Sequence, residues 1–217
     1  MAILYPSLIS ADVLNLASVL KRLDSCVSGY HIDIMDFNFV PNLTWGPPIV
    51  NAIAQATTKQ LWVHLMVNNP KGMIKALDLR PDSIVSFHIE SYSENKTIIN
   101  DIQEKRYLPS IAISPKTPVE EILPFLSTIY QVLVMSVEPG FSGQLFLPET
   151  ISKVDTLVQY KKNHNLNFRI GMDGGINKKN INNLITHGVD DIAIAHAIFG
   201  SPDYVQALHN LMRELNY

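Results

Sequence analysis

The feature that most constrains the fold is a regular alternation of short β-rich runs with longer helical segments along the whole chain. We predict eight strands and eight helices, because the helical segments begin and end with capping and stop signals. The strands are expected at Ile3–Leu8, Gly29–Met35, Leu61–Met66, Ser83–His88, Ser110–Ile113, Val132–Val137, Phe168–Met172 and Asp191–Ile194. The helices are expected at Val13–Leu23, Pro47–Ala56, Pro70–Leu79, Ser93–Lys105, Pro118–Leu126, Pro148–Asn163, Asn177–His187 and Ser201–Leu215.

Strict alternation implies parallel strands joined by right-handed crossovers, which leaves an open doubly wound sheet or a closed eight-stranded barrel. Eight such units in 217 residues match the minimal size of a (β/α)8 TIM barrel. Open sheets of this kind mostly have about five or six strands and a glycine-rich turn after the first one. The first turn here, Ser7–Asp12, contains no glycine. We therefore predict a single TIM-barrel domain over residues 1–217, with its functional site at the carboxyl ends of the strands.

The composition excludes several other classes of protein. With 47% hydrophobic residues, 17% charged residues and a net charge of -3, the chain resembles neither a disordered protein nor a basic nucleic-acid binder. Its single cysteine, Cys26, cannot form an intramolecular disulfide. No apolar run approaches the roughly 20 residues of a membrane span, and the first residues lack a secretion signal. We expect a cytoplasmic protein that binds neither nucleic acid nor membranes.

Polar side chains that ought to face the barrel interior point to a metal site. Side chains alternate across a strand, so His31 and Asp33 share the inward face of the second strand. A buried carboxylate there would cost several kcal/mol unless it met a cation or a proton. The third strand places His64 in the same way, and Asp173 ends the seventh. A single inward histidine is as often a core residue as a ligand, but two histidines and two aspartates at strand ends favour a site for Zn²⁺, Fe²⁺ or Mn²⁺.

Glycine-rich turns give a second, weaker signal. One turn, Gly140–Gly143, follows the sixth strand, and the pair Gly174–Gly175 follows the seventh. Backbone N–H groups exposed in such turns can hold a phosphate group, and TIM barrels often bind phosphate late in the chain. The two turns together therefore suggest a phosphorylated substrate.

The chain resembles the ribulose-phosphate 3-epimerase family over nearly its whole length. The matching segments are Pro6–Asp12, His31–Asp36, Phe39–Thr44, His64–Val67, Val134–Phe141, Gly143–Gln144 and Met172–Ile176. The resemblance implies a metal-dependent TIM-barrel enzyme of the pentose phosphate pathway that interconverts D-ribulose 5-phosphate and D-xylulose 5-phosphate. It further implies a cytosolic homo-oligomer, either a dimer or a hexamer.

The same resemblance assigns roles to individual residues. It implies that His31, Asp33, His64 and Asp173 bind one divalent ion (Zn²⁺, Fe²⁺, Mn²⁺ or Co²⁺), and that the two aspartates also transfer protons. Three methionines match residues that cap the reaction intermediate in this family, and Ser7 matches a serine that contacts substrate. The residues expected to bind substrate are Ser7, Met35, His64, Met66, Met135, Gly140, Phe141, Ser142, Gly143, Asp173, Gly174, Gly175, Ala195 and His196.

Independently of the resemblance, the chemistry of 3-epimerisation requires two acid/base groups. The proton on the carbon next to the ketone leaves from one face and another proton returns on the opposite face, through a cis-enediolate. Asp33 and Asp173 lie on well-separated strands and fit that requirement. Following the family, Asp33 would accept the proton and Asp173 would donate it in the ribulose-to-xylulose direction.

Three positions depart from the family pattern and leave other functions open. Phe37–Asn38 stands where the family commonly has Gly-His, Ser142 replaces a common glycine, and Ala195–His196 replaces a Gly-Ser pair. These changes keep 3-epimerisation of a hexulose phosphate such as D-allulose 6-phosphate as an alternative. An alternative of another class is a non-catalytic protein that binds sugar phosphates. A Schiff-base aldolase is disfavoured because no lysine falls within a predicted strand.

Overall fold

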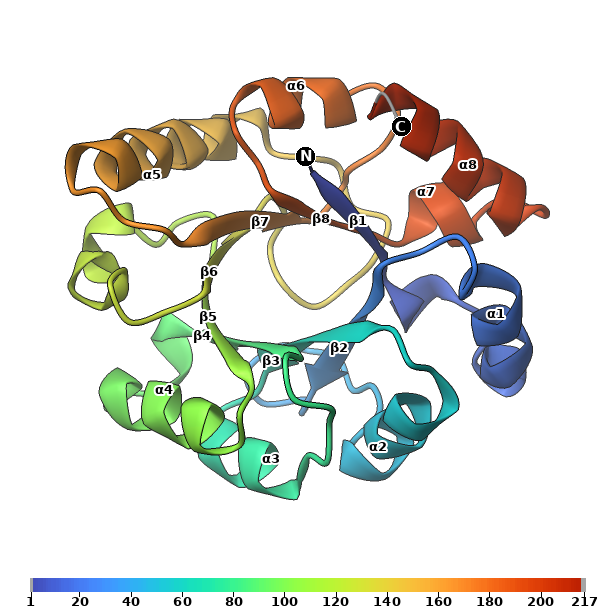
Figure 1. Cartoon of the computed structure of the whole chain (residues 1–217), viewed down its shortest axis with the longest axis horizontal. Coiled ribbons are helices and arrows are strands. Elements are labelled where there is room, and N and C mark those ends of the chain that lie inside the picture. The colour runs from blue at the N-terminus through green and yellow to red at the C-terminus, as the bar shows by residue number, and fades with distance from the viewer. Residues whose placement is uncertain (1, 216–217) are drawn as a thin grey trace.

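The computed structural model describes residues 2–215, and eight parallel strands form its centre (Figure 1). The strands are β1 (Ile3–Pro6), β2 (Gly29–Met35), β3 (Gln60–Met66), β4 (Ile84–His88), β5 (Leu108–Ile113), β6 (Gln131–Met135), β7 (Arg169–Asp173) and β8 (Asp191–Ile194). Each strand from β2 to β7 pairs in parallel with the next one along the chain, and β8 pairs in parallel with β1. The prediction of a (β/α)8 TIM barrel is confirmed.

One isolated β-bridge joins the two ends of the sheet and nearly closes the barrel. Ser7, just past the end of β1, forms a parallel bridge with His31 of β2. The strands β1 and β2 otherwise lie at the two ends of the sheet order. The junction that completes the ring therefore involves two residues that the sequence assigns to the site.

Helices surround the sheet on its outer side (Figure 1). The α-helices are α1 (Leu16–Leu23), α2 (Pro47–Ala56), α3 (Pro70–Ala76), α4 (Asn95–Glu104), α5 (Ile151–Asn163), α6 (Ile181–Thr186), α7 (His196–Phe199) and α8 (Tyr204–Glu214). Short 3-10 helices are η1 (Leu8–Ser10), η2 (Val13–Asn15), η3 (Ile89–Ser91), η4 (Val119–Glu121), η5 (Leu123–Phe125) and η6 (Pro148–Thr150). Within residues 2–215, no helix has the length and the apolar character needed to cross a membrane.

One predicted helix is wrong, and one helix was missed. The segment Pro118–Leu126 forms the 3-10 helices η4 and η5 instead of one α-helix. Pro124 lies in its middle, where a proline lacks the N–H for a helical hydrogen bond and its ring clashes with the preceding turn. The single-turn helix α7 was not expected, because four residues are too few to show a helical period. The first strand also ends at Pro6 instead of Leu8, since Leu8 begins η1.

The alternation of side chains separates two apolar layers. Outward residues of the strands, such as Ile32 and Val63, belong to the large core between the sheet and the helices. Inward residues such as Tyr5 and Trp62 fill the barrel itself. Gly171 of β7 leaves room for the Trp62 ring, because a Cβ at this glycine would lie 2.7 Å from that ring. The barrel interior below the site is therefore filled by a large aromatic side chain.

A polar network occupies the opposite, amino-terminal end of the barrel. Asp191 at the start of β8 is fully buried, and Arg169 at the start of β7 donates to both of its carboxylate oxygens over 2.7 and 2.6 Å. Gln131 Nε2 donates to Asp191 Oδ2 at 2.8 Å, and Ser110 donates to the Gln131 side-chain oxygen. A bidentate arginine compensates a buried carboxylate well. This network therefore ties the starts of β5, β6, β7 and β8 together.

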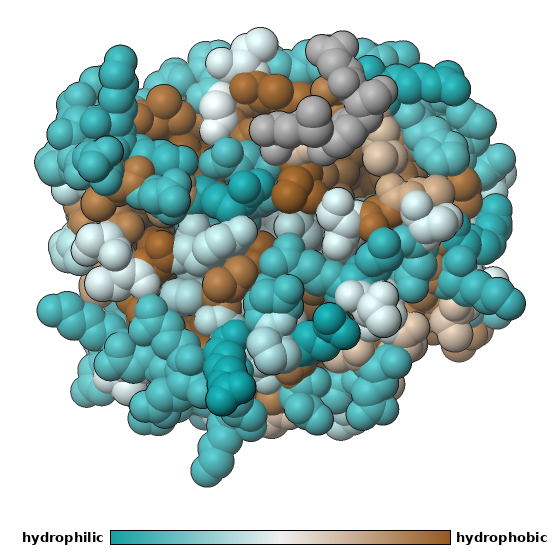
Figure 2. Space-filling view, in the orientation of Figure 1, coloured by the Kyte–Doolittle hydropathy of each residue, from teal (hydrophilic) through white to brown (hydrophobic). Residues whose placement is uncertain are grey.

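On the face drawn in Figure 2, hydrophilic residues predominate, and hydrophobic residues form smaller groups between them. The burial pattern of the helices agrees with this, since α4 buries Ile98, Ile99 and Ile102 and exposes polar residues such as Asn100 and Gln103, as an amphipathic helix on a core requires.

We predict that Arg169→Met destabilises the protein by about 3 kcal/mol, because it leaves the Asp191 carboxylate buried without its cation. Urea unfolding measures the change. Lys116→Met serves as the control, since it breaks the exposed pair between Lys116 and Glu138 and should cost at most about 1 kcal/mol. Equal losses in both variants would contradict the role of the buried network.

Candidate metal centre

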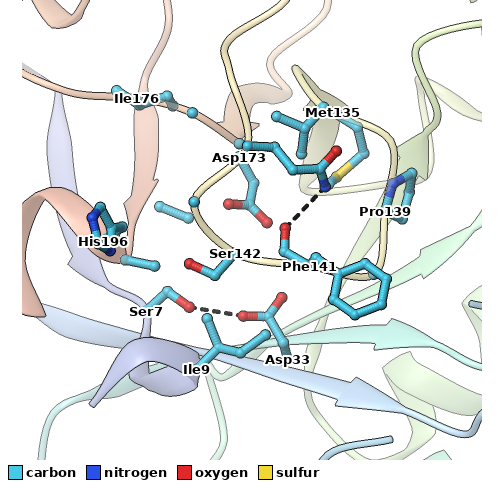
Figure 3. A pocket seen from close by; sticks show the side chains of 18 of the residues that line it. Ser7, Ile9, Asp33, Met135, Pro139, Phe141, Ser142, Asp173, Ile176 and His196 are labelled. Carbon is cyan, nitrogen blue, oxygen red and sulfur yellow. Dashed lines mark hydrogen bonds between the residues drawn. The ribbon is translucent and has the colours of Figure 1, made fainter. Parts of the chain in front are cut away.

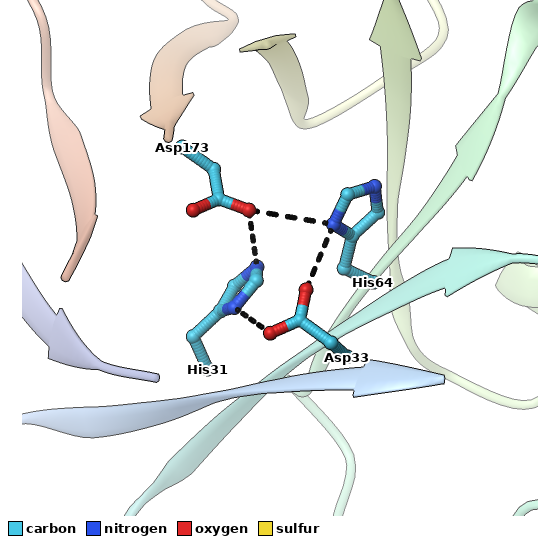
Figure 4. Close-up of side chains that lie close together, drawn as sticks. All are labelled: His31, Asp33, His64 and Asp173. Carbon is cyan, nitrogen blue, oxygen red and sulfur yellow. Dashed lines mark hydrogen bonds and ion pairs between the residues drawn. The ribbon is translucent and has the colours of Figure 1, made fainter. Parts of the chain in front are cut away.

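Four predicted side chains meet at the carboxyl ends of three strands (Figure 4). His31 and Asp33 come from β2, His64 from β3 and Asp173 from the last position of β7. Each of the four offers one possible ligand atom, and these atoms lie within 4.8 Å of one another. Asp33 and His64 are direct cross-strand partners in the β2–β3 register. The alternation that the sequence suggested thus brings all four side chains to one point.

The distances within this cluster show tight charge compensation. His64 Nδ1 lies 3.3 Å from Asp33 Oδ1 and 3.6 Å from Asp173 Oδ2. His31 Nδ1 lies 3.3 Å from Asp33 Oδ2, and its Nε2 lies 4.0 Å from Asp173 Oδ2. Both imidazoles are fully buried, Asp33 is 3% exposed, and the Asp173 side chain is 17% exposed. Only Asp173 therefore has appreciable contact with solvent.

Burial and charge oppose each other at Asp33 and His64. Burial alone would raise the pKa of Asp33, but attraction to His31 and the hydrogen bond and attraction to His64 outweigh it and hold that pKa well below its usual range. Burial alone would lower the pKa of His64, yet its close contacts with Asp173 and Asp33 raise it to about 9. The two aspartates thus make this position favourable for positive charge.

Among the four side chains of the cluster, His31 has the surroundings most typical of a metal ligand. Both of its ring nitrogens are buried and have no hydrogen-bond partner in the described part of the chain. A buried imidazole without partners is unfavourable, because its lost hydration is not replaced. Two histidines and two aspartates form a donor set suited to Zn²⁺, Fe²⁺, Mn²⁺ or Co²⁺. The cluster is therefore a chemically reasonable site for one divalent ion.

A cavity of about 270 Å³ opens beside the cluster, and Asp33 and Asp173 point toward each other into it (Figure 3). Of the residues expected to bind substrate, those that line it are Ser7, Met35, Met66, Met135, Gly140, Phe141, Ser142, Gly143, Asp173, Gly174, Gly175, Ala195 and His196. His64 is the exception, since it is fully buried and is not among the lining residues. Ser7 Oγ donates to Asp33 Oδ2 at 2.7 Å.

Lining residues that the sequence did not suggest come mainly from the same loops. They are Ile9, Val137, Pro139, Gln144, Leu145, Ile176, Asn177, Ala193 and Ala197. Among the described residues, no lysine or arginine lines this cavity. An anionic ligand would therefore have to be bound by backbone donors, hydroxyl groups or an imidazole.

The loop after β6 is tied to two other loops over the cavity. Asn42, in the loop after β2, donates to the Gly140 carbonyl at 2.7 Å. Ser142 and Ser10 share a hydrogen bond between their hydroxyl groups, also at 2.7 Å. The serine that replaces the family's glycine thus contacts η1 in the first loop. These contacts hold the loop across the mouth of the cavity.

The glycines after β7 have a steric role. Gly174 and Gly175 have φ values of 119° and 62°, a region that favours glycine. A Cβ at Gly174 would lie 2.6 Å from the Val137 side chain, and one at Gly175 would clash with the Phe146 backbone nitrogen. These glycines therefore permit close packing between the loops after β6 and β7.

Two other departures from the family have visible consequences. Phe37 has a φ of 59°, so a residue with a Cβ takes a left-handed conformation in which glycine is unstrained. Its ring is exposed. His196, in turn, is the first residue of α7 and lies exposed at the edge of the cavity (Figure 3).

Two residues behind His64 were missed by the sequence analysis. His88 ends β4, and its Nε2 lies 2.9 Å from His64 Nε2. Its Nδ1 lies 3.0 Å from Glu90 Oε2. Burial lowers the pKa of His88 to about 4, although the contact with Glu90 acts to raise it. The available signal was the inward position at the end of a strand, which His88 shares with the other histidines.

Comparisons with known proteins show which family the sequence is similar to. A family model described as the ribulose-phosphate 3 epimerase family matches residues 3–199. The "Ribulose-phosphate 3-epimerase, cytoplasmic isoform" of Oryza sativa subsp. japonica is 36% identical over 215 residues, which cover 97% of this chain and 92% of the rice protein. The ribulose-phosphate 3-epimerase of Schizosaccharomyces pombe is 40% identical over 198 residues, covering 89% of this chain and 85% of that protein.

Solved structures share the fold at much lower identity. KGPDC from Streptococcus mutans has a TM-score of 0.70 and 12% identity, with 100% of this chain and 98% of that chain covered. This likeness concerns the barrel alone.

We predict that a divalent ion stabilises the protein and that His31→Gln weakens this effect. At a hundredfold excess over Kd, a bound ion should add about 2.7 kcal/mol to the free energy of unfolding. A roughly tenfold loss of affinity in the variant would remove about 1.4 kcal/mol of that gain. Thermal unfolding with and without metal measures it in each protein.

The matched control is His187→Gln, which removes an imidazole outside the cluster that contacts only Asp155 among the described ion pairs. This variant should keep the whole metal-induced shift. A shift of equal size in His31→Gln would exclude His31 as a ligand.

Proposed function

The chain belongs to the ribulose-phosphate 3-epimerase family, and we propose that it interconverts D-ribulose 5-phosphate and D-xylulose 5-phosphate with one bound divalent ion. The observation that carries this proposal is the cluster of two histidines and two aspartates, whose carboxylates point into the cavity. A protein that only bound sugar phosphates would not need two carboxylates facing one reacting carbon. An enzymatic function is therefore favoured over non-catalytic binding of a sugar phosphate.

His31, Asp33, His64 and Asp173 would hold the ion. When bound, a divalent cation supplies positive charge that stabilises the negative charge developing on substrate oxygens. The donor set is compatible with Zn²⁺, Fe²⁺, Mn²⁺ and Co²⁺, so the proposal names no single metal.

Asp33 and Asp173 are the proposed acid/base pair. In the ribulose-to-xylulose direction, Asp33 accepts the proton from C3 and Asp173 donates a proton to the opposite face of the cis-enediolate. Their origin on β2 and β7, on different sides of the cavity, supports this division of roles. Ser7 orients Asp33 through the 2.7 Å hydrogen bond to Oδ2.

Three methionines would cover the reacting carbon. Met35, Met66 and Met135 line the cavity and are each 3% exposed or less. Their thioethers are adaptable and carry no acidic proton, so they can exclude water without offering a competing proton donor. This leaves the two aspartates as the proton carriers.

The phosphate group would bind at the turns after β6, β7 and β8. Backbone N–H groups of Gly143, Gly175 and Ala195, together with the His196 side chain, are the proposed donors. The lining without lysine or arginine supports such a neutral binding site. We further propose that the chain forms one domain, assembles as a homo-oligomer and works in the cytoplasm, as the family resemblance implies.

We predict that Asp33→Asn and Asp173→Asn each slow epimerisation by about 10²–10⁴-fold, because an amide cannot exchange the proton. Proton NMR in D₂O measures deuterium uptake at C3. Asp33→Asn should block uptake that starts from D-ribulose 5-phosphate, and Asp173→Asn should block uptake that starts from D-xylulose 5-phosphate.

The control for these variants is Asp155→Asn, an exposed carboxylate on α5. Metal content is measured in every variant, since both aspartates are proposed ligands. Wild-type exchange by Asp33→Asn from D-ribulose 5-phosphate, or by Asp173→Asn from D-xylulose 5-phosphate, would refute the two-carboxylate mechanism.

The competing substrate is a hexulose phosphate, which the altered Phe37 and His196 positions keep in consideration. We predict that kcat/KM for D-ribulose 5-phosphate exceeds that for D-allulose 6-phosphate by about tenfold or more, because the cavity must accommodate an additional carbon. Assays at matched concentrations decide. A preference for the hexulose phosphate would replace the proposed substrate while leaving the chemistry unchanged.

A further inference from the structure

One nitrogen of His64 is directed away from the two aspartates (Figure 4). Its Nδ1 faces Asp33 and Asp173, and its Nε2 lies 2.9 Å from His88 Nε2. For Nδ1 to bind a metal ion it needs a free lone pair, so the ring proton of a neutral His64 must reside on Nε2. Whatever faces Nε2 therefore influences whether Nδ1 can act as a ligand.

The hydrogen bonds beyond His64 have only one consistent direction. A carboxylate can only accept, so Glu90 Oε2 requires a proton on His88 Nδ1, 3.0 Å away. A neutral His88 with that proton has a lone pair on Nε2. This lone pair accepts the proton on His64 Nε2, which frees Nδ1 of His64.

Glu90 itself is fixed from the other side. Its Oε1 accepts the backbone N–H of Ser114 at 2.8 Å and the Thr117 hydroxyl. Lys153 of α5 then holds that turn by donating to the Ser114 and Thr117 carbonyls over 2.8 and 2.5 Å. Because both groups donate to Oε1, residue 90 must have an acceptor oxygen at this position, which the ionised carboxylate of Glu90 supplies.

Water cannot easily take the place of these partners. Both His64 and His88 are fully buried, and the Phe39 ring lies against His88 with 4.8 Å between ring centroids. A buried imidazole therefore depends on the protein for the partner that decides its tautomer.

We propose that Glu90, acting through His88, is a positioning residue that holds His64 in the tautomer whose Nδ1 binds the metal ion. The inference rests on the proposed metal centre. Glu90 touches neither the cavity beside the metal cluster nor the four ligands, and its effect reaches the metal only through two imidazoles.

The substitution Glu90→Gln tests this directly. With its oxygen still accepting from Ser114 and Thr117, the glutamine turns its NH₂ group toward His88 Nδ1 and opposes the proton there. His88 would then carry its proton on Nε2 and donate it to His64 Nε2. The proton of a neutral His64 would in that case reside on Nδ1, where it blocks metal binding. We expect Zn²⁺ affinity, measured by competition with a chromogenic chelator, to fall about 10–100-fold.

Glu121→Gln is the matched control, because Glu121 is an exposed carboxylate on the nearby helix η4. It removes the same charge without touching His88 and should leave Zn²⁺ affinity within about twofold. A tenfold loss in this control would assign the effect to charge alone and overturn the proposal.

A double-mutant cycle with His88→Gln separates the relay from a merely structural role. A relay predicts that Glu90→Gln has little further effect, below about threefold, once His88 is replaced. If the loss stays tenfold or more in the His88→Gln background, Glu90 does not act through His88 and the proposal fails.

The unaltered Zn²⁺-loaded protein provides a test that needs no variant to fold. Long-range ¹H–¹⁵N spectra should show protons on Nδ1 of His88 and on Nε2 of His64. A proton on Nε2 of His88 would overturn the relay.

The outcomes also separate this inference from the proposed function. Failure of the unaltered protein to bind Zn²⁺, Mn²⁺, Fe²⁺ or Co²⁺ would overturn the metal centre and the relay together. Tight binding by the unaltered protein with equal binding by Glu90→Gln would overturn the relay alone.

Discussion

Charge compensation between two aspartates and two buried histidines is the interaction on which the site depends. Asp33 and Asp173 come from strands on different sides of the barrel, and their carboxylates would repel each other in a poorly hydrated place. His31 and His64 lie beside both, and a divalent ion would complete the compensation. The arrangement exists only if β2, β3 and β7 keep their register, because a shift by one residue would turn each side chain toward the helices.

The rest of the barrel makes that register rigid. Trp62 fills the interior below His31. The two rings pack edge to face with 4.8 Å between their centroids, and Gly171 leaves room for the Trp62 ring. At the far end, Asp191 and Arg169 connect the starts of neighbouring strands. The site thus stands on a packed aromatic layer, as preorganised acid/base groups require.

Binding of an anion by a chain of net charge -3 has to come from local features. No lysine or arginine lines the cavity among residues 2–215, and the loops above it are joined by hydrogen bonds through Asn42 and Ser142. Glycines at positive φ let these loops pack closely. Recognition of the proposed sugar phosphate would therefore depend on loop geometry more than on charge.

Strand alternation and helix signals were sufficient to predict the barrel and the four clustered side chains, because they are local patterns that the fold obeys. Local patterns failed at Pro118–Leu126, where an internal proline outweighed an apolar period, and at the single turn α7. Only the tertiary structure revealed that Gly174 and Gly175 serve loop packing and that His88 and Glu90 stand behind His64. These features arise from contacts between segments far apart in the chain. The residue pattern of one strand does not show which side chains of other segments will contact it.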